Sequence, residues 1–528
     1  MEAREEGDYD PMAFLLLNNS GNSIELTNFT DRFSSHDQSN DGRAAELSFA
    51  QRSGMMSAST GATFVGWIRT RKNAVPVCVF LVVALIALVA LSQRSPSVEW
   101  PQSTAKAIRV ENTPQARGEA WLRGHPEYGA MPTWRKHQLM ALATLYYATW
   151  MGSPGSNSRW LDGSIHECDW TVHNNNANRD KKPTCTSEGE YTSLEFLESG
   201  LQGTLPEEVS FLTKLTSLAL QKMSIHGTIP RRFGALTALT NLQLERNRFT
   251  GEVPNFLFSN MPHLQVLRLE TNAFSGTLST EIGKLTALEK FSFSGNHNLK
   301  GHLPTELGFL TLLKELDLVR NSLSGQLPTE LGLATALSIL RLSHNPWTGR
   351  LPSELVRLSN LFSLDINDNL MTGTLSFAGS AWGHLNTLML SGTHVSGTLP
   401  QEGWDKLTGL EFIHLSSNRL SGPLPSELGL LFSRLFKLEL HMNQLTGQLP
   451  TELGLLTSVT RLSLHDNPLT GTIGSELGLM RNLWHLDLSK TSLSGLIPSE
   501  ICSLPRLESV KVDCQLVKCN CEGTCRCQ

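Results

Sequence analysis

The stretch LKELDLVRNSLSGQLPTELGLATAL, residues 313–337, holds one complete unit of a repeat that fills most of this chain. Numbered from Leu313 as position 1, the unit reads L-x-x-L-x-L-x-x-N-x-L-x-G-x-L-P and ends in a tail of the ELGLAT kind. Thirteen copies follow one another over residues 191–506, at intervals of 24 or 25 residues. A fixed period of this length predicts a solenoid, in which each copy forms one coil. Position 1 of the successive copies is Tyr191, Leu215, Leu239, Leu264, Leu288, Leu313, Leu337, Leu361, Leu385, Leu410, Leu435, Val459 and Leu483.

The spacing within a copy predicts the conformation of each coil. Leucines at positions 4 and 6, such as Leu316 and Leu318, alternate with polar residues, which indicates a short strand with one buried face. Asn at position 9, present in nine copies, supplies an amide that can donate to backbone carbonyls in a buried bend. Gly at position 13, or at position 14 in the copy that begins at Leu288, permits a left-handed or closely packed backbone. Stacked coils bury these leucines in one continuous core.

The half-repeat NSLSGQLPTELGLATAL, residues 321–337, resembles the plant-type leucine-rich-repeat (LRR) family. This resemblance implies an α/β solenoid, a horseshoe with a parallel β-sheet on its concave face and 3₁₀ turns on its convex side. It also implies a helical N-terminal cap and a cysteine-rich C-terminal cap. Within the family, the chain resembles single-pass membrane-anchored LRR proteins of diatoms, which lack a kinase domain.

The N-terminal part predicts a membrane anchor. Residues 1–73 are rich in Ser, Asn, Gly and Asp, which indicates a disordered tail. Residues 74–92 are uncharged and largely apolar, and nineteen residues in a helix span the hydrocarbon of a bilayer. Arg69, Arg71 and Lys72 precede this segment, whereas Arg94 alone follows closely, so the positive-inside rule favours a cytosolic N-terminus and a type II protein. The glycosylation acceptors Asn18 and Asn28 lie in the tail and favour the inverted topology, in which the chain would be a cytosolic LRR scaffold.

Residues 93–130 contain four prolines and mixed charges, and we expect a linker there. Residues 131–190 are the expected N-terminal cap, with a helix from Arg135 to Trp150 whose apolar residues share one face. The resemblance implies a disulfide between Cys168 and Cys185, with a surface loop inserted between them. Residues 507–528 are the expected C-terminal cap, beginning with a fourteenth strand that contains Val510 and Val512.

The cysteines of the C-terminal end allow two interpretations. Together with the N-terminal pair they give an even number beyond the predicted membrane segment, which favours disulfide-stapled caps. Six cysteines allow fifteen pairings, among which the sequence does not choose. The alternative is a metal-binding knot built on Cys519-x-Cys521 and Cys525-x-Cys527. The six cysteines are Cys502, Cys514, Cys519, Cys521, Cys525 and Cys527.

Binding residues are expected on the concave face, at positions 2, 3, 5, 7 and 8. Position 5 carries Asp317, Arg341 and Asp365 in successive copies, which predicts a ladder of opposite charges. That ladder is either part of a binding surface or a solvated row of weak ion pairs. We therefore include Arg341 and Asp365 among the candidate ligand-binding residues.

The last four copies concentrate histidine on the same face. His414, His441, His465 and His485 all occupy concave positions, and His441 and His465 share one column. Ordinary surface histidines, a ligand-binding patch and a metal site are the three alternatives. Aromatic residues at neighbouring positions favour the ligand-binding patch, because binding surfaces are rich in aromatic anchors. The candidate residues here are His414, Phe436, Glu439, His441, His465, Trp484 and Asp487.

Composition and missing motifs narrow the function. A net charge of −5 is too mild for a nucleic-acid-binding chain. No kinase, P-loop, dinucleotide or zinc-protease motif is present, so we expect a non-enzymatic protein with no cofactor and no metal. We expect a cell-surface recognition protein, at the plasma membrane or an endomembrane, that binds a peptide, protein or glycan on its concave face. Residues 1–73 would contact a co-receptor or a cytosolic adaptor. The alternative is a surface-held inhibitor or adhesion module, similar to polygalacturonase-inhibiting LRR proteins.

Overall fold

A computed structural model describes residues 98–149, 159–171, 182–431, 434–521 and 523–527. The chain divides into two compact units, Met1–Ser95 and Pro96–Gln528, and every described residue lies in the second unit. The predicted tail, membrane segment and cap insertion at 172–181 lie outside the described residues. Within the described ranges, no helix has the length and apolar character needed to cross a bilayer.

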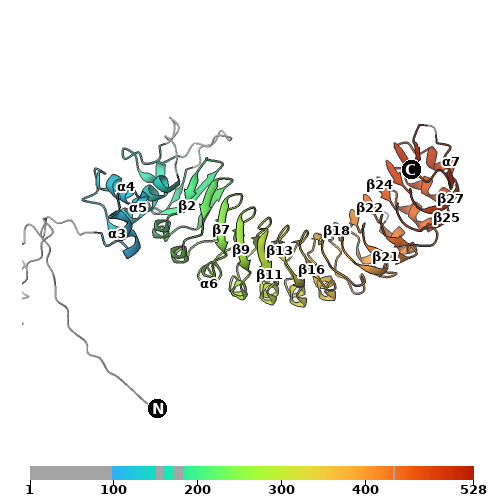
Figure 1. Ribbon diagram of the computed structural model, residues 1–528, viewed down its shortest axis with the longest axis horizontal. Coiled ribbons are helices and arrows are strands. Elements are labelled where there is room, and N and C mark those ends of the chain that lie inside the picture. The colour runs from blue at the N-terminus through green and yellow to red at the C-terminus, as the bar shows by residue number, and fades with distance from the viewer. Residues whose placement is uncertain (1–97, 150–158, 172–181, 432–433, 522, 528) are drawn as a thin grey trace, which may run out of the picture. The chain divides into compact units, whose positions relative to one another are not determined.

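One long β-sheet lines the inner side of the solenoid (Figure 1). Each coil contributes one strand to it, and neighbouring strands are parallel, except that β1 pairs with β2 in the antiparallel sense. Its sixteen strands are, in order, β1 (Thr184–Cys185), β2 (Tyr191–Leu197), β4 (Ser217–Gln221), β6 (Asn241–Gln243), β8 (Val266–Arg268), β10 (Lys290–Ser292), β12 (Glu315–Asp317), β15 (Ile339–Arg341), β17 (Ser363–Asp365), β18 (Thr387–Met389), β20 (Phe412–His414), β22 (Lys437–Glu439), β24 (Arg461–Ser463), β26 (His485–Asp487), β28 (Ser509–Val512) and β30 (Cys525–Cys527).

In this sheet, each residue pairs with the residue at the same repeat position of the neighbouring coil. Phe291, Leu316 and Leu340 are direct partners at position 4 of three successive coils, and each is completely buried. Position 6 is equally buried, as at Leu318 and Leu342. The predicted alternation is therefore confirmed, and a single apolar core runs the length of the solenoid because every coil covers its neighbour.

Asn at position 9 performs the predicted role in the bend. The Nδ2 of Asn345 donates to the carbonyls of Leu318, Leu342 and Ser343, and its Oδ1 accepts from the backbone N–H of Leu323. Asn345 is only 5% exposed, so these backbone groups would otherwise be buried without partners. One amide therefore joins two successive coils as well as closing its own turn.

A second row of short parallel sheets follows the bend. The thirteen glycines of this bend, one in each copy, have positive φ, from 73° at Gly422 to 104° at Gly203, as the sequence suggested. A Cβ on Gly325 would overlap the ring of His302 on the preceding coil, so close packing also requires glycine there. These strands are β3 (Gln202–Thr204), β5 (Ser224–Gly227), β7 (Arg248–Glu252), β9 (Ala273–Thr277), β11 (Asn298–Gly301), β13 (Ser322–Leu323), β14 (Gly325–Gln326), β16 (Trp347–Thr348), β19 (Ser396–Thr398), β21 (Arg419–Gly422), β23 (Gln444–Leu445), β25 (Thr470–Thr472), β27 (Ser492–Leu496) and β29 (Val517–Lys518).

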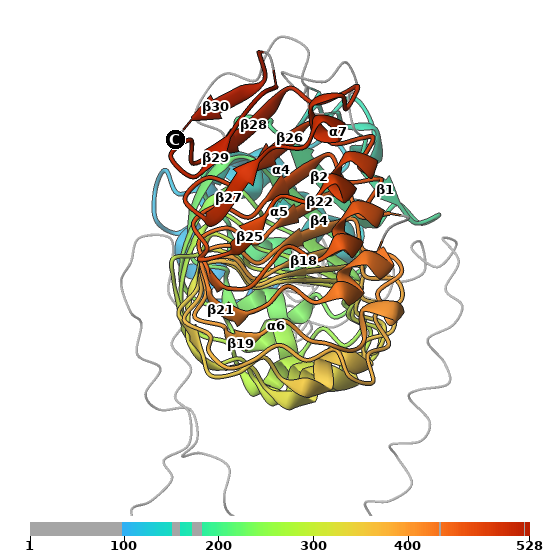
Figure 2. The ribbon, with the colours of Figure 1, turned by 90° about the vertical axis from the view of Figure 1, so that its right-hand side faces the viewer.

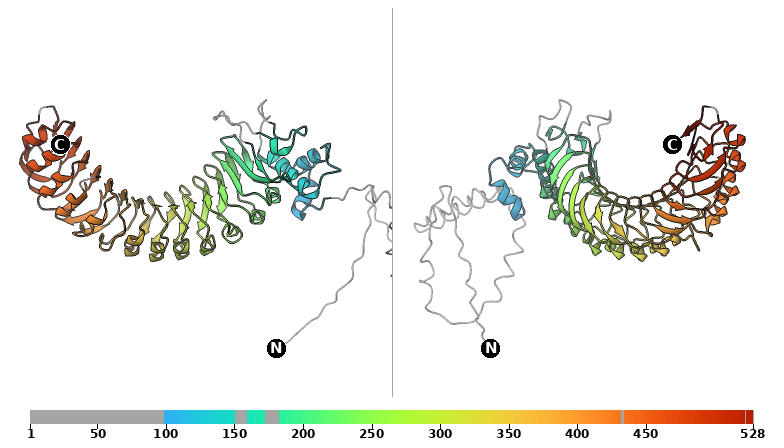
Figure 3. Two further views of the ribbon diagram at one scale, coloured as in Figure 1. Left: turned by 180° about the vertical axis from the view of Figure 1, so that it is seen from behind. Right: turned by 45° about the vertical axis from the view of Figure 1, so that its right-hand side comes forward.

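Short 3₁₀ helices form the outer side of the arc, as predicted (Figures 2 and 3). Most begin directly after the position-16 proline, which holds an extended conformation, such as φ −69° and ψ 138° at Pro328. They are η2 (Glu207–Phe211), η3 (Arg231–Ala235), η4 (Thr280–Lys284), η5 (Thr305–Phe309), η6 (Thr329–Leu333), η7 (Ser353–Arg357), η8 (Trp404–Lys406), η9 (Ser426–Leu431), η10 (Thr451–Leu455) and η11 (Ser475–Leu479), while α6 (Phe256–Ser259) and α7 (Ser499–Cys502) are α-helical turns.

The N-terminal cap is larger than the sequence predicts. The expected helix is present as α5 (Thr133–Thr149), but the expected linker is wrong for the described residues 98–130. These contain α3 (Gln102–Ile108) and α4 (Pro114–Arg123), which pack into the cap. Thr104 and Gln115 both donate to the buried carboxyl of Glu208 in η2, at 2.8 and 3.2 Å, and so fasten both helices to the first coil.

Disulfides close both caps. Cys168, which lies in η1 (Glu167–Asp169), pairs with Cys185 of β1 at the N-terminal end. At the C-terminal end the sulfur atoms of Cys519, Cys521 and Cys525 lie within 4.8 Å of one another, as a metal site would require. Each of them is bonded to another cysteine, so the disulfide interpretation holds and the metal-binding alternative is wrong. The C-terminal pairs are Cys502–Cys521, Cys514–Cys527 and Cys519–Cys525.

Candidate functional site

The predicted charge ladder in the middle of the concave face is half formed. Asp317, Arg341 and Asp365 are direct neighbours on β12, β15 and β17. The Arg341 guanidinium lies 3.8 Å from Asp317 and 3.9 Å from Glu315. Asp365 instead accepts hydrogen bonds from Ser343 and from the backbone N–H of Asn367. The acidic side chains of this row are thus largely satisfied within the protein.

The C-terminal third of the concave face begins with a cluster of three residues, His414, Lys437 and Glu439. Nδ1 of His414 lies 3.0 Å from one carboxylate oxygen of Glu439, and Nζ of Lys437 lies 2.7 Å from the other. Burial opposes ionisation of Glu439, but the hydrogen bonds from His414 and Lys437 and their charges outweigh it. Together they lower the pKa of Glu439 to about 2. This carboxylate is therefore fixed in place and stays ionised under all ordinary conditions.

His441 and His465 lie one coil apart with their rings stacked, 4.4 Å between centroids. His465 is held by the carboxylate of Asp466, 2.8 Å from its Nδ1. His441 Nδ1 is buried and has no hydrogen-bond partner among the described residues. Burial, and next the neighbouring His465, lower the pKa of His441, against the opposing pull of nearby carboxylates. His441 is consequently neutral at pH 7 and keeps unused hydrogen-bonding capacity.

Asp487 lies at the end of this row. Its carboxylate accepts from Ser489 Oγ at 2.6 Å and pairs with Lys511 Nζ at 3.2 Å, while His485 stands 3.9 Å away. Burial opposes ionisation of Asp487, but the Ser489 and Lys511 contacts lower its pKa. Asp487 is only 4% exposed, so it supports its neighbours more than it faces solvent.

A shallow hollow of about 760 Å³ lies beside these polar residues, and we name it the C-terminal hollow. Phe436 and Trp484, at position 2 of alternate coils, stand at its two sides and are 47% and 42% exposed. Thr460, at position 2 of the coil between them, is its floor. The Arg461 guanidinium lies 5.6 Å from the centroid of the Trp484 ring. The lining consists of Phe436, Lys437, Thr460, Arg461, Asn482, Trp484, Pro505, Arg506 and Glu508.

The structure therefore divides the predicted residues into groups. Arg341 and Asp365 belong to the middle of the arc, and His414, Glu439, His441, His465 and Asp487 form a polar row. Phe436 and Trp484 frame the hollow. Sequence reasoning missed Arg461 and Arg506, although tabulating position 3 would have revealed a basic column of Lys437, Arg461 and His485. The hollow has exposed aromatic faces, whereas the polar row is largely satisfied internally, so an apolar side chain is the group that this site could best accept.

Comparison with known proteins identifies the repeats. The family model described as Leucine Rich Repeat matches residues 312–333, 409–431 and 482–504. No curated protein shows a significant match to the whole chain.

Solved structures of plant receptors match the fold. The plant peptide hormone receptor RGFR1 in complex with RGF2 is 32% identical, with 63% of this chain and 54% of that chain covered and a TM-score of 0.60. The complex of PEPR1 with AtPEP1 is also 32% identical, covers 72% of this chain and 51% of its own, and has a TM-score of 0.64. The Arabidopsis receptor kinase HAESA, in complex with the peptide hormone IDA and the co-receptor SERK1, is 25% identical, with coverages of 70% and 68% and a TM-score of 0.50. The chain thus spans about half the length of the first two structures.

Proposed function

Because this chain is a leucine-rich-repeat protein of the plant type, we propose that it recognises a peptide or protein ligand on the C-terminal third of its concave face. The observation that carries this proposal is the C-terminal hollow. Two large aromatic side chains remain about half exposed on a sheet face, two coils apart, with only a threonine between them. Exposed aromatic anchors that face a depression are the usual energetic centre of a binding surface.

The dimensions of the hollow suit a side chain of a ligand. Adjacent strands of a sheet are about 4.8 Å apart, so Phe436 and Trp484 stand roughly 10 Å apart along the sheet. That gap accepts one flat or branched apolar side chain in contact with both rings. Lys437, Arg461 and Arg506 at the rim favour an acidic group next to it. The structural relatives described as peptide receptors support a peptide as this ligand.

The polar candidates extend the proposed surface toward the middle of the arc. His441 contributes a neutral ring to this surface, and its stacked partner His465 keeps that ring in position. We propose that His414, Glu439 and Asp487 orient this row, and that Arg341 and Asp365 contact the far end of a longer ligand.

We propose that the repeats lie outside the cytosol, carried by a single membrane span at residues 74–92 with a cytosolic N-terminus. The four disulfides support an oxidising compartment. Such a receptor-like protein would act through a co-receptor, or through an adaptor that binds residues 1–73. Protease digestion of intact cells tests the orientation: cleavage within the repeats agrees with it, whereas protected repeats with glycan on Asn18 or Asn28 contradict it.

Selection from a random peptide display library tests the binding proposal. The full-length chain is the bait, and the enriched peptides are synthesised for affinity measurement. Trp484→Ala should weaken their binding about tenfold, because it removes one wall of the hollow. Phe362→Ala is the matched control, since Phe362 is 49% exposed at position 2 of a middle coil and lies outside the hollow lining. Equal losses in both variants, or a loss in neither, would refute the hollow as the binding site.

The alternative function is that of a surface-held inhibitor. Such an inhibitor would still act as the free ectodomain, whereas a receptor requires residues 1–73 for its effect.

A further inference from the structure

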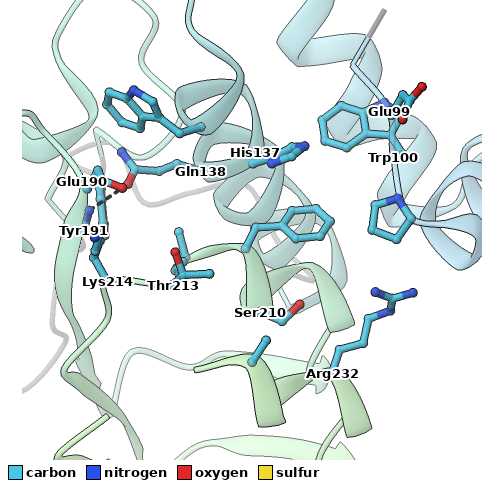
Figure 4. Close-up of a pocket in the computed structure, with 15 residues that line it drawn as sticks. Glu99, Trp100, His137, Gln138, Glu190, Tyr191, Ser210, Thr213, Lys214 and Arg232 are labelled. Atoms are coloured by element: carbon cyan, nitrogen blue, oxygen red, sulfur yellow. Dashed lines mark hydrogen bonds between the residues drawn. The ribbon is translucent and has the colours of Figure 1, made fainter. Parts of the chain in front are cut away.

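A second hollow lies at the opposite end of the solenoid, where the cap meets the first two coils (Figure 4). It has a volume of about 530 Å³, and we name it the cap hollow. Residues 99–101 before α3, the helix α5, η2 with the loop that follows it, and η3 all contribute to its walls. It shares no residue with the C-terminal hollow.

Aromatic rings form one wall of the cap hollow. His137 lies between Trp100 and Phe211, with ring centroids 5.3 and 5.1 Å away. Burial lowers the pKa of His137, so this ring is neutral at pH 7 and extends the aromatic wall without charge. Trp134 also lines the hollow and is 36% exposed. This wall is therefore aromatic and uncharged.

The opposite wall presents an unused hydroxyl. Ser210 is 5% exposed, lines the hollow, and is labelled across from His137 and Trp100 in Figure 4. Its hydroxyl has no hydrogen-bond partner among the residues that the structure describes. Gln138, by contrast, is fully used: its Oε1 accepts from Tyr191 N–H at 2.7 Å and its Nε2 donates to Gly189 at 2.9 Å. A nearly buried hydroxyl without a partner at the edge of a cavity is a group that a ligand can satisfy.

The charges around the cap hollow balance. Two carboxylates, Glu99 and Glu190, and two cations, Lys214 and Arg232, contribute to the lining. The two signs are present in equal number within the lining, and Arg232 also pairs with Glu207 outside it, 3.2 Å away. Such a mixed lining does not select a strongly charged ligand, whereas a neutral ligand with many hydroxyls could donate to the carboxylates and accept from the cations.

We infer that the cap hollow is a binding site for a neutral hexose unit of a glycan. A pyranose ring has an apolar face that packs on aromatic rings, and its edge carries hydroxyls that both donate and accept. The cap hollow offers both in one place: the uncharged rings of Trp134, Trp100 and His137, and the polar groups of Ser210, Glu190 and Lys214. This site is independent of the concave face, so the chain would hold a surface glycan while it recognises a second ligand elsewhere.

Titration of the full-length chain with defined hexasaccharides tests this inference. The probes are a β-1,4-linked glucohexaose, a β-1,3-linked glucohexaose and an α-linked mannohexaose, with saturation-transfer NMR and calorimetry as readouts. We expect at least one of them to bind. Trp134→Ala should weaken that binding by about fivefold or more, because an exposed ring face is lost while the core is untouched. Ser210→Ala should weaken it roughly threefold through one hydrogen bond.

The control is Trp484→Ala, which removes an equally exposed tryptophan from the C-terminal hollow. It should leave hexasaccharide binding unchanged and weaken peptide binding only, so the two proposals fail separately. The inference is overturned if none of the three hexasaccharides binds, or if Trp134→Ala binds as the unaltered chain does. Loss of peptide binding in Trp134→Ala, with no sugar bound by either protein, would also overturn it and would make the cap hollow a protein contact.

Discussion

His441 and His465 lie just after the neighbouring strands β22 and β24, with their imidazole planes only 17° from parallel and their centroids 4.4 Å apart. Two imidazoles this close cannot both accept a proton without repulsion, and burial already disfavours the charged form of His441. Glu439, Asp466 and Asp487 act in the opposite direction but do not outweigh these effects. The pKa of His441 therefore lies below its ordinary value.

Ligand affinity should consequently depend on pH through this pair. A selected peptide with a carboxylate facing these rings should bind roughly threefold to tenfold more tightly at pH 5 than at pH 7.5, as His441 gains a proton. The double variant His441→Gln, His465→Gln should show a flat profile. His226→Gln, which alters an exposed histidine of β5, is the control and should keep the full pH dependence. An unchanged profile in the double variant would place the ligand elsewhere on the arc.

Glu270 should make the protein less stable as pH rises. Burial raises the pKa of its carboxyl to about 7, and the neighbouring Glu245 adds to the rise. The folded state thus binds more protons than the unfolded chain between pH 4.5 and 7, so the free energy of unfolding falls across that interval, by up to about 3 kcal/mol. Glu270→Gln should match the unaltered chain near pH 5 and exceed it at pH 8 in urea unfolding. Glu402→Gln, at an exposed position, should change neither value, and a similar effect of both substitutions would contradict the account.

Asn345→Ala should strongly weaken the solenoid. The substitution leaves three carbonyls and one backbone N–H without their partner in a buried bend, which costs roughly 2–4 kcal/mol. Asn360→Ala is the matched control, because the exposed Asn360 amide makes a single bond to the Thr335 carbonyl. The midpoint of urea unfolding should fall clearly for the first variant and little for the second. Equal shifts would mean that the asparagine bonds do not hold the coils together.

Reduction should lower the melting temperature by opening both caps. The Cys514–Cys527 bond closes a loop with a sequence separation of 13, for which the chain-entropy model gives about 3 kcal/mol. The double variant Cys514→Ser, Cys527→Ser should therefore melt lower under oxidising conditions, and reductant should lower the melting temperature of the unaltered chain further. Detection by mass spectrometry of free thiols at all eight cap cysteines of the native protein, with no effect of reductant, would contradict the disulfide caps.

The sequence predicted what the period enforces. Each coil repeats the buried leucines at positions 4 and 6, the Asn amide and the glycine bend. The conformation inferred for one coil therefore applies to all the others. It did not predict the left-handed backbone at position 8, which occurs at residues such as Lys222 and Arg320. No residue type marks that position, because the bend forced by its neighbours overrides local preference.

The sites were less predictable because they depend on contacts between distant segments. Phe436 and Trp484 lie two coils apart, and Arg506 enters the C-terminal hollow from the far end of the Trp484 copy, so only a built solenoid reveals the depression. The helices α3 and α4 looked like a linker, since short segments with prolines and mixed charge carry little signal of their own. Their order comes from Glu208, which lies 104 residues from Thr104 in the sequence.

Site-directed photo-crosslinking of a selected peptide tests the central claim most directly. A benzophenone amino acid is placed either at Glu508, an exposed residue on the rim of the C-terminal hollow, or at Phe309, 57% exposed in a convex 3₁₀ helix. The account predicts a crosslink to the peptide from position 508, abolished by an excess of unlabelled peptide, and none from position 309. Crosslinking from position 309 alone would contradict recognition on the concave face.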